Sequence, residues 1–227
     1  METVLLIVAL VTGVVSGFSR TAPLPQSKMH TFQLVLLKKG TQPLDQKTLQ
    51  AHGAFVTRLG DDGKALVAGP FTDGGDIVGA IMLRAATADE ARTIQAEDPA
   101  VKAGLFTMEI LPFMSTDEGQ FKAWEKPFAQ ETVYFGFLNS GPNRSQSKEE
   151  AQELQKQHIA FMNGQAEQGK LIVAGPFVDG GTRRGIVVYR EASLETAKAR
   201  AEQDPMVKVD RLAVELHPWR VPKGALK

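Results

Sequence analysis

A tandem repeat is the feature that most constrains the fold of this chain. Residues 68–75, Ala-Gly-Pro-Phe-Thr-Asp-Gly-Gly, return at 174–181 as Ala-Gly-Pro-Phe-Val-Asp-Gly-Gly, an offset of 106 residues. The same offset aligns residues 52–113 with residues 158–219 without a gap, and about a third of those positions are identical. Chance does not produce such an alignment. The chain is therefore predicted to contain two copies of one module.

Each copy is predicted to have the element order β-α-β-β-α-β. In the first copy a strand at 32–37 precedes an amphipathic helix, and two more strands surround the turn Asp73-Gly74-Gly75. A capping box at 87–90 opens a second helix, which is expected to stop before Asp98-Pro99 because proline disfavours helix at the preceding residue. A last strand is predicted from Leu105 to Pro112. The second copy repeats this order, beginning with a strand at 133–138.

This order is that of the ferredoxin-like arrangement, in which two helices cover one face of a four-stranded antiparallel sheet. The other face of the sheet is left bare and needs a partner, which the second copy supplies. We therefore predict an α+β fold in which two ferredoxin-like modules pack sheet to sheet as an intramolecular dimeric α+β barrel. The modules are placed at residues 29–114 and 131–220, with a linker at 115–130. The result is a pseudo-dimer within one chain, and further oligomerisation stays open.

The N-terminus differs from the rest of the chain. Residues 4–15 are almost all apolar, a run about as long as the apolar region of a secretory signal peptide and shorter than the ~18–20 residues that span a bilayer. This pattern predicts a signal peptide over residues 1–22 and a secreted or periplasmic protein without membrane contact after cleavage. The alternative is an uncleaved segment that anchors the chain in the membrane.

Composition excludes several classes of function. The 26 basic and 26 acidic side chains give a formal net charge of +0, and aromatics make up 7% of residues, so no nucleic-acid surface is indicated. The absence of cysteine excludes disulfides, thiolate catalysis and cysteine-ligated zinc. Four histidines without i,i+4 spacing on a helix do not predict a metal site. No serine nucleophile signature or dinucleotide fingerprint is present, so no cofactor is expected.

The repeated residues resemble those of the YCII-related domain family. They are a histidine in the first helix, Gly-Lys-x-x-x-Ala-Gly-Pro, a glycine-rich turn, and Asp-Pro at the end of the second helix. The resemblance covers most of residues 31–219, twice. It implies ferredoxin-like modules that pair into dimeric α+β barrels, with a histidine and an aspartate in a cleft as the proposed catalytic pair. Some members carry out lyase or dehalogenase chemistry on small ring compounds.

Carried over position by position, the resemblance implies His52 with Asp98 in the first copy and His158 with Asp204 in the second. A neutral imidazole beside a carboxylate can move a proton near neutral pH, because the carboxylate orients the ring and stabilises its charged form. The alternative for each histidine is a core residue on the apolar face of its helix. The alternative for each aspartate is local turn chemistry before proline.

Other repeated positions have simpler interpretations. The Ala-Gly-Pro-Phe-x-Asp-Gly-Gly segment is interpreted as a strand end and hairpin, with a pocket rim as the alternative. Arg84 and Arg190 are interpreted as solvated charges at strand ends. Arg183 and Arg184 replace Ile77 and Val78 of the first copy, so the two clefts are expected to differ in charge. His217 replaces Leu111 and is interpreted as incidental.

Two functional hypotheses follow. The first is an exported YCII-related enzyme that uses a His–Asp pair for proton transfer in lyase- or isomerase-type chemistry on a small organic molecule. The second is a non-catalytic barrel that binds a ligand or serves only a structural role. Whether each imidazole faces an open pocket distinguishes the two.

Overall fold

The structure of the protein is a computed structural model that describes residues 29–116, 121–126, 129–179 and 181–227. The predicted signal peptide at residues 1–22 lies outside the described residues, as do parts of the predicted linker. Within the described ranges, no helix is both long and apolar enough to cross a membrane.

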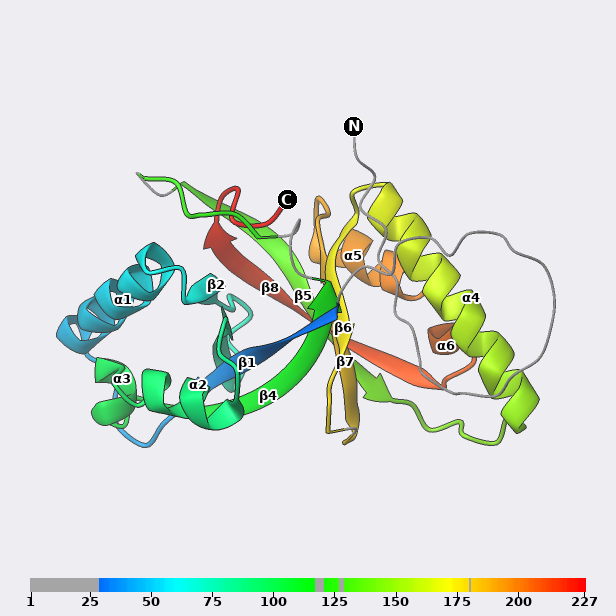
Figure 1. The fold of residues 1–227 in the computed structure, drawn as a ribbon, viewed down its shortest axis with the longest axis horizontal. Helices are drawn as coiled ribbons and strands as arrows, with labels where there is room; N and C mark the ends of the chain where they lie inside the picture. Colours follow the sequence, from blue (N-terminus) through cyan, green and yellow to red (C-terminus); the bar gives the residue numbers. More distant parts are fainter. Residues whose placement is uncertain (1–28, 117–120, 127–128, 180) are drawn as a thin grey trace.

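The chain forms two successive modules, each with four strands, two main helices and one extra helical turn (Figure 1). The elements of the first module are β1 (Met29–Lys39), α1 (Gln46–Asp61), β2 (Ala65–Pro70), β3 (Ile77–Leu83), α2 (Ala88–Gln95), α3 (Pro99–Lys102) and β4 (Phe106–Thr116). Those of the second module are β5 (Gln130–Ser140), α4 (Lys148–Glu167), β6 (Leu171–Pro176), β7 (Arg183–Tyr189), α5 (Leu194–Ala201), α6 (Pro205–Lys208) and β8 (Leu212–Pro222).

Both sheets have the strand order of the predicted ferredoxin-like arrangement. The order is β2-β3-β1-β4 in the first module and β6-β7-β5-β8 in the second, and all neighbouring strands are antiparallel. The prediction of two α+β modules in one chain is thus confirmed. The last strand of the first module is longer than predicted, because β4 pairs with β1 from Lys39↔Phe106 to Met29↔Thr116. That pairing carries the strand into the segment predicted as linker.

Alternation along the strands divides the apolar side chains between two layers. In β1, Phe32, Leu34 and Leu36 point away from the helices and join a core to which both sheets contribute, whereas Val35 and Leu37 pack under α1 and α2. The core between the sheets is rich in aromatic rings that are at most 8% exposed: Phe32, Phe71, Phe113, Phe135, Phe137, Phe177 and Trp219. The bare face of each sheet is therefore covered by the other, as the sequence predicted.

The Ala-Gly-Pro-Phe segments join the two sheets. Phe71 forms a bridge with Trp219, and Phe177 forms the equivalent bridge with Phe113. Thr72 N donates to Pro218 O at 3.0 Å, and the indole Nε1 of Trp219 donates to Gly69 O at 2.9 Å. These bonds connect β2 of one module with β8 of the other and close the barrel.

The glycine of this segment is required by a close approach between backbones. A Cβ on Gly69 would lie 1.8 Å from Arg220 O, and a Cβ on Gly175 would lie 1.8 Å from Met114 O. No side chain can be accommodated at such a distance without moving the strands apart. The repeated glycine is therefore explained by the contact between the modules.

We predict that Gly69→Ala lowers the free energy of unfolding by about 3 kcal/mol, because the added methyl group must separate β2 from β8. Gly164→Ala is the control, since a Cβ at Gly164 in α4 meets no atom within 4 Å and alanine favours helix by up to about 1 kcal/mol. Chemical denaturation of both variants measures the difference. Equal stability of the two variants would contradict the close approach.

A charged cluster also links the modules. Glu109 in β4 is 2.6 Å from Lys38 Nζ in β1, and it accepts a hydrogen bond at 3.0 Å from Arg183 Nη1 in β7. Partial burial acts to raise the pKa of Glu109, but the hydrogen bonds and positive charges of Lys38 and Arg183 outweigh it and lower the pKa below its usual value. The ionised carboxylate is therefore stabilised by folding.

A carboxylate whose pKa is lower in the folded state stabilises the fold at pH values above its unfolded pKa, which is 4.5 for glutamate. This stabilisation is lost as the pH falls through the folded pKa. We predict that Glu109→Gln reduces the free energy of unfolding near neutral pH by up to about 1 kcal/mol, and that the difference from wild type disappears in acid. Denaturation curves across pH measure this effect. The same change in an Arg183→Ile background should have less effect; an undiminished effect would show that Arg183 takes no part.

Candidate functional site

The first His–Asp pair joins helix α1 to the turn before α3. His52 Nδ1 lies 2.7 Å from Asp98 Oδ2, and the side chains are 20% and 0% exposed. Asp98 is the N-cap of α3, since its Oδ1 accepts from Ala100 N at 2.9 Å. Gln95 Nε2 donates to the same Oδ2 at 2.7 Å. Because Asp98 accepts a backbone N–H and an amide N–H, we assign it as a carboxylate, and the proton between it and His52 to Nδ1.

The second pair repeats this geometry. His158 Nδ1 in α4 lies 2.6 Å from Asp204 Oδ2, with side chains 13% and 3% exposed. Asp204 Oδ1 accepts from Met206 N at 2.8 Å and caps α6. Ala201 occupies the position of Gln95, so the second pair lacks the amide donor. Burial and the negative charge of Asp204 raise the pKa of the neighbouring Tyr189 phenol, so that it stays neutral.

Each imidazole faces a pocket between the long helix of its module and the sheet. The pocket at His52 has a volume of about 320 Å³ and that at His158 about 200 Å³, sizes that suit a small organic molecule. Nε2 of each ring has no hydrogen-bond partner among the described residues. The histidines predicted to lie on the apolar helix faces are therefore half-buried, with one nitrogen held by aspartate and the other available to a ligand.

The pocket at His52 is mostly apolar and is completed by the second module. Phe106 meets the imidazole edge-on at 5.3 Å between centroids. Trp124 from the connection between the modules covers one side, with its Nε1 donating to Leu66 O at 2.9 Å. Arg220 from β8 also lines this pocket. Trp124 was not among the predicted residues, because nothing in the sequence places the connection over α1.

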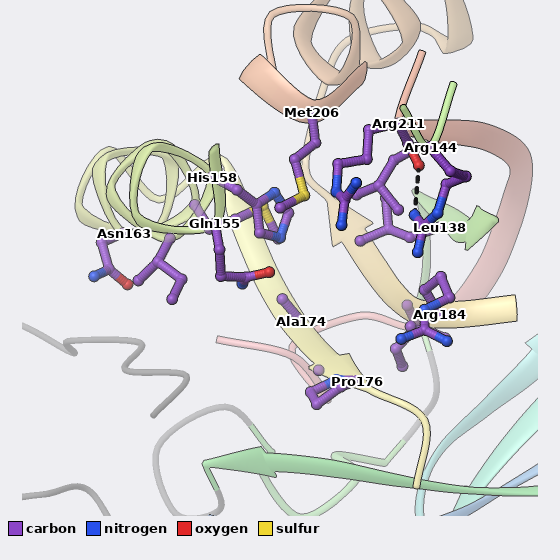
Figure 2. Close-up of a pocket in the computed structure, with 16 residues that line it drawn as sticks. Leu138, Arg144, Gln155, His158, Asn163, Ala174, Pro176, Arg184, Met206 and Arg211 are labelled. Atoms are coloured by element: carbon purple, nitrogen blue, oxygen red, sulfur yellow. Dashed lines mark hydrogen bonds between the residues drawn. The ribbon is translucent and has the colours of Figure 1, made fainter. Parts of the chain in front are cut away.

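The pocket at His158 is lined by the second module and is rich in arginine (Figure 2). Arg144, Arg184 and Arg211 lie on the side opposite His158 and Gln155. The predicted difference in charge between the clefts is present, since Arg184 stands where the first module has Val78. Arg211 replaces Leu105, a substitution that is visible in the alignment of the two copies and could have predicted a further charge in this pocket. Arg144 lies in the connection between β5 and α4, and the equivalent connection of the first module, residues 40–45, contains no arginine.

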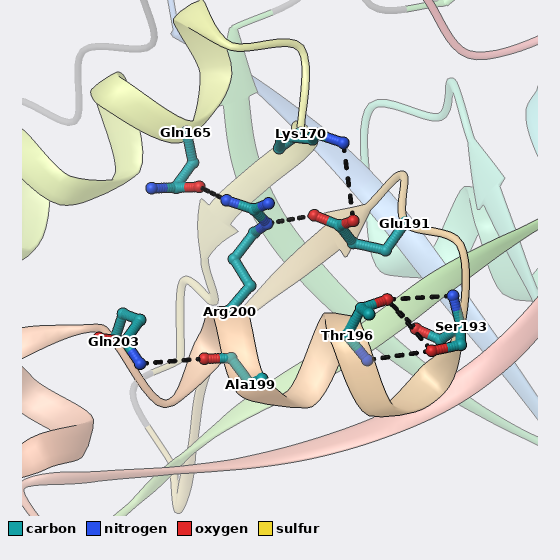
Figure 3. Close-up of polar contacts among 8 residues, drawn as sticks. All are labelled: Gln165, Lys170, Glu191, Ser193, Thr196, Ala199, Arg200 and Gln203. Carbon is teal, nitrogen blue, oxygen red and sulfur yellow. Dashed lines mark hydrogen bonds and ion pairs between the residues drawn. The ribbon is translucent and has the colours of Figure 1, made fainter.

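The second module also contains a half-buried polar network whose key positions are apolar in the first (Figure 3). Arg200 in α5 binds Glu191 and the Gln165 side-chain oxygen, and Lys170 Nζ lies 3.6 Å from Glu191. Ile94 and Ala85 occupy the positions of Arg200 and Glu191 in the first module. This network fixes the C-terminal part of α4, the helix that carries His158, against α5.

A third histidine–carboxylate contact lies between the modules. His217 Nδ1 is 2.5 Å from Asp73 Oδ2, and its ring stacks on Phe71 at 4.9 Å between centroids. Burial acts to raise the pKa of Asp73, but hydrogen bonds from His217 and the Gly75 amide lower it overall. The interpretation of His217 as incidental overlooked this partner, which only the packing of β8 against the β2–β3 turn brings near. His217 lines neither of the two pockets that contain His52 and His158.

Other positions singled out in the sequence have structural roles. Ala68, Gly69 and Pro70 form a wall of the first pocket as well as the junction between modules. Arg190 at the end of β7 donates to Leu226 O at 3.0 Å, near the C-terminus. In the described part of the chain, no group of three or more histidine, aspartate and glutamate side chains could hold a metal ion.

Comparison with known proteins gives the family. The sequence model of the YCII-related domain matches residues 29–114 and again residues 136–220. The chain belongs to the YCII-related domain family. The two matches confirm the tandem duplication, and the resemblance of the repeated residues is confirmed with it. No curated protein matches this YCII-related chain.

Solved structures share the fold at low sequence identity. A mutant chlorite dismutase from Candidatus Nitrospira defluvii, in complex with cyanide, is 10% identical with a TM-score of 0.55, over 86% of this chain and 91% of that chain. A heme-binding protein from Thermus thermophilus is 14% identical with a TM-score of 0.49, over 90% of this chain and 95% of that chain. The chlorite dismutase likeness shows that the YCII-related chain has the dimeric α+β barrel fold.

We predict that Asp204→Asn reverses the tautomer of His158. The asparagine oxygen can still accept from Met206 N, which turns its NH₂ group toward the imidazole and favours a bare Nδ1 with the proton on Nε2. Two-bond ¹H–¹⁵N correlation spectra, recorded where the ring is neutral, distinguish the two tautomers. His52 in the same molecule is the control and should keep its proton on Nδ1. A proton on Nε2 of His158 in the unmodified protein would contradict the assigned geometry.

Proposed function

We propose that this YCII-related protein binds small organic molecules in its two pockets and transfers protons within them through the His–Asp pairs. One observation carries the proposal. In both modules an imidazole lines a pocket while its Nδ1 lies 2.7 or 2.6 Å from a carboxylate that is 0% or 3% exposed. If the His–Asp pairs served only packing, there would be no reason for the histidine to line a pocket in both modules.

The geometry supports the following chemistry. Nε2 removes a proton from a carbon or oxygen atom of the substrate, and the electron pair of the broken bond stays on the substrate. The resulting imidazolium is stabilised by Asp98 or Asp204, and it returns the proton to another substrate atom or to a leaving group. This sequence suits an isomerisation or an elimination beside a carbonyl, with no net change in oxidation state. The apolar walls of the pocket exclude water around the reacting atoms.

A structural role for the pairs has an observation of its own. Asp98 and Asp204 cap short helices through Ala100 N and Met206 N, which any aspartate before proline could do. Capping, however, uses only Oδ1, and the buried Oδ2 needs a partner of its own, which Gln95 Nε2 already provides in the first module but no described side-chain amide provides in the second. In each module the histidine supplies a partner for Oδ2. The second candidate is therefore a ligand-binding barrel in which the histidine serves only as a hydrogen-bond partner for the buried aspartate.

Exchange of enolisable protons with deuterium oxide tests catalysis without knowledge of the natural substrate. Phenylpyruvate and phenylacetone, one anionic and one neutral, serve as probes, and NMR follows the loss of the proton beside the carbonyl. We expect the protein to accelerate exchange of at least one probe, and loss of the responsible histidine, in His52→Ala or His158→Ala, to slow it by a factor of about 10² or more.

His30→Ala is the matched control, because His30 in β1 lines neither pocket. Thermal denaturation shows whether each variant is folded. Exchange that is not accelerated by the protein, or that survives both pocket substitutions unchanged, would overturn the catalytic proposal and favour the ligand-binding barrel.

A further inference from the structure

Three arginines converge on the pocket beside His158 without a carboxylate among them. Arg144 comes from the connection between β5 and α4, Arg184 from β7, and Arg211 from the residue before β8. The described residues that line this pocket include no aspartate or glutamate. Figure 2 shows the guanidinium groups of Arg211 and Arg184 on the side of the pocket across from the imidazole. Three like charges are thus held at one pocket wall.

Hydrogen bonds to uncharged oxygen atoms position these guanidinium groups. Arg144 Nη1 donates to Arg211 O at 3.2 Å, and Arg211 Nη1 donates to the Gln146 side-chain oxygen at 2.7 Å. These partners orient Arg144 and Arg211 without neutralising them, and Arg184 Nη1 donates to Gly181 O at 3.4 Å. Partial burial and the positive charges of Arg144 and Arg184 lower the pKa of Arg211, because both charges repel its guanidinium. An anion placed among them would relieve this repulsion.

We propose that the pocket at His158 recognises small organic anions, with the arginines binding a carboxylate or phosphate group and the apolar wall holding the rest of the molecule. This inference deepens the proposed function, on which it rests for the shared pocket and the role of His158. Guanidinium groups match the geometry of such oxyanions and form stronger hydrogen bonds to them than to neutral groups. Met162, Ile186 and Leu212 provide the apolar side of the same cavity.

The first module offers an internal comparison. Val78 and Leu105 stand in place of Arg184 and Arg211, and the connection from β1 to α1 contains no arginine or lysine. Among the described residues that line the pocket at His52, Arg220 is the one arginine or lysine. The two pockets are thus assigned different ligands, an anion in the second module and a largely apolar molecule in the first.

Binding of benzoate, its neutral isostere benzamide and inorganic phosphate to the whole protein tests the proposal. We expect benzoate and phosphate to shift the backbone amide signals of Gly175 and Gly185, which line the pocket at His158. The substitutions Arg184→Val and Arg211→Leu insert the residues of the first module. Each should raise the benzoate dissociation constant about tenfold, and both together about a hundredfold, while weak benzamide binding should change little.

Arg58→Gln is the charge-matched control, because Arg58 is exposed on α1 and lines neither pocket. It should change the dissociation constant by less than about twofold, since distant surface charges are screened. Unchanged benzoate affinity in the double variant, equal loss of benzoate and benzamide binding, or no shift with either anion would overturn the inference. The deuterium exchange of the neutral probe tests the proposed function separately, because it needs no anion.

Discussion

The contact between two sheets is the constraint on which the rest of this structure depends. Each module exposes a row of apolar side chains on the sheet face opposite its helices, and covering that face removes large aromatic rings from water. The backbones approach so closely at Gly69 and Gly175 that no side chain fits there. Because Phe71, after β2, bridges to Trp219 in β8 and Phe177, after β6, bridges to Phe113 in β4, both modules are held at both edges of the contact. The pockets lie outside this core, between sheets and helices.

Filling the space between the sheets with aromatic side chains leaves the helix side as the place for ligands. The Ala-Gly-Pro segment takes part in both layers, since its glycine meets the other module and its flanking residues wall the pocket. A His–Asp pair then joins the long helix to the helical turn beside the sheet in each module. The buried aspartate oxygens are satisfied by a backbone amide and by the histidine. The same bonds that complete the local fold therefore also orient the imidazole toward the pocket.

Duplication within one chain allows the two pockets to differ, which identical subunits of a symmetric dimer cannot do. The second module has three arginines where the first has Val78, Leu105 and a shorter connection. It also has the Arg200–Glu191 network under α4, whereas the first pocket is covered by Trp124. Positions that are identical in the two copies include those that close the barrel and hold the imidazoles. Positions that differ include Val78 and Arg184, which line the two pockets.

The sequence by itself determined the repeat, the order of strands and helices and the sheet-to-sheet arrangement. These follow from alternation, capping and the offset of 106 residues, all of which act over short distances along the chain or by comparison of its halves. The residues of both His–Asp pairs were implied by the resemblance to the YCII-related family. Only the tertiary structure decided that Gln95 joins the first pair, that Trp124 covers the first pocket, and that His217 meets Asp73. The last two contacts join residues 58 and 144 positions apart. Such contacts depend on how the two sheets cross, and no local pattern of side chains encodes that geometry.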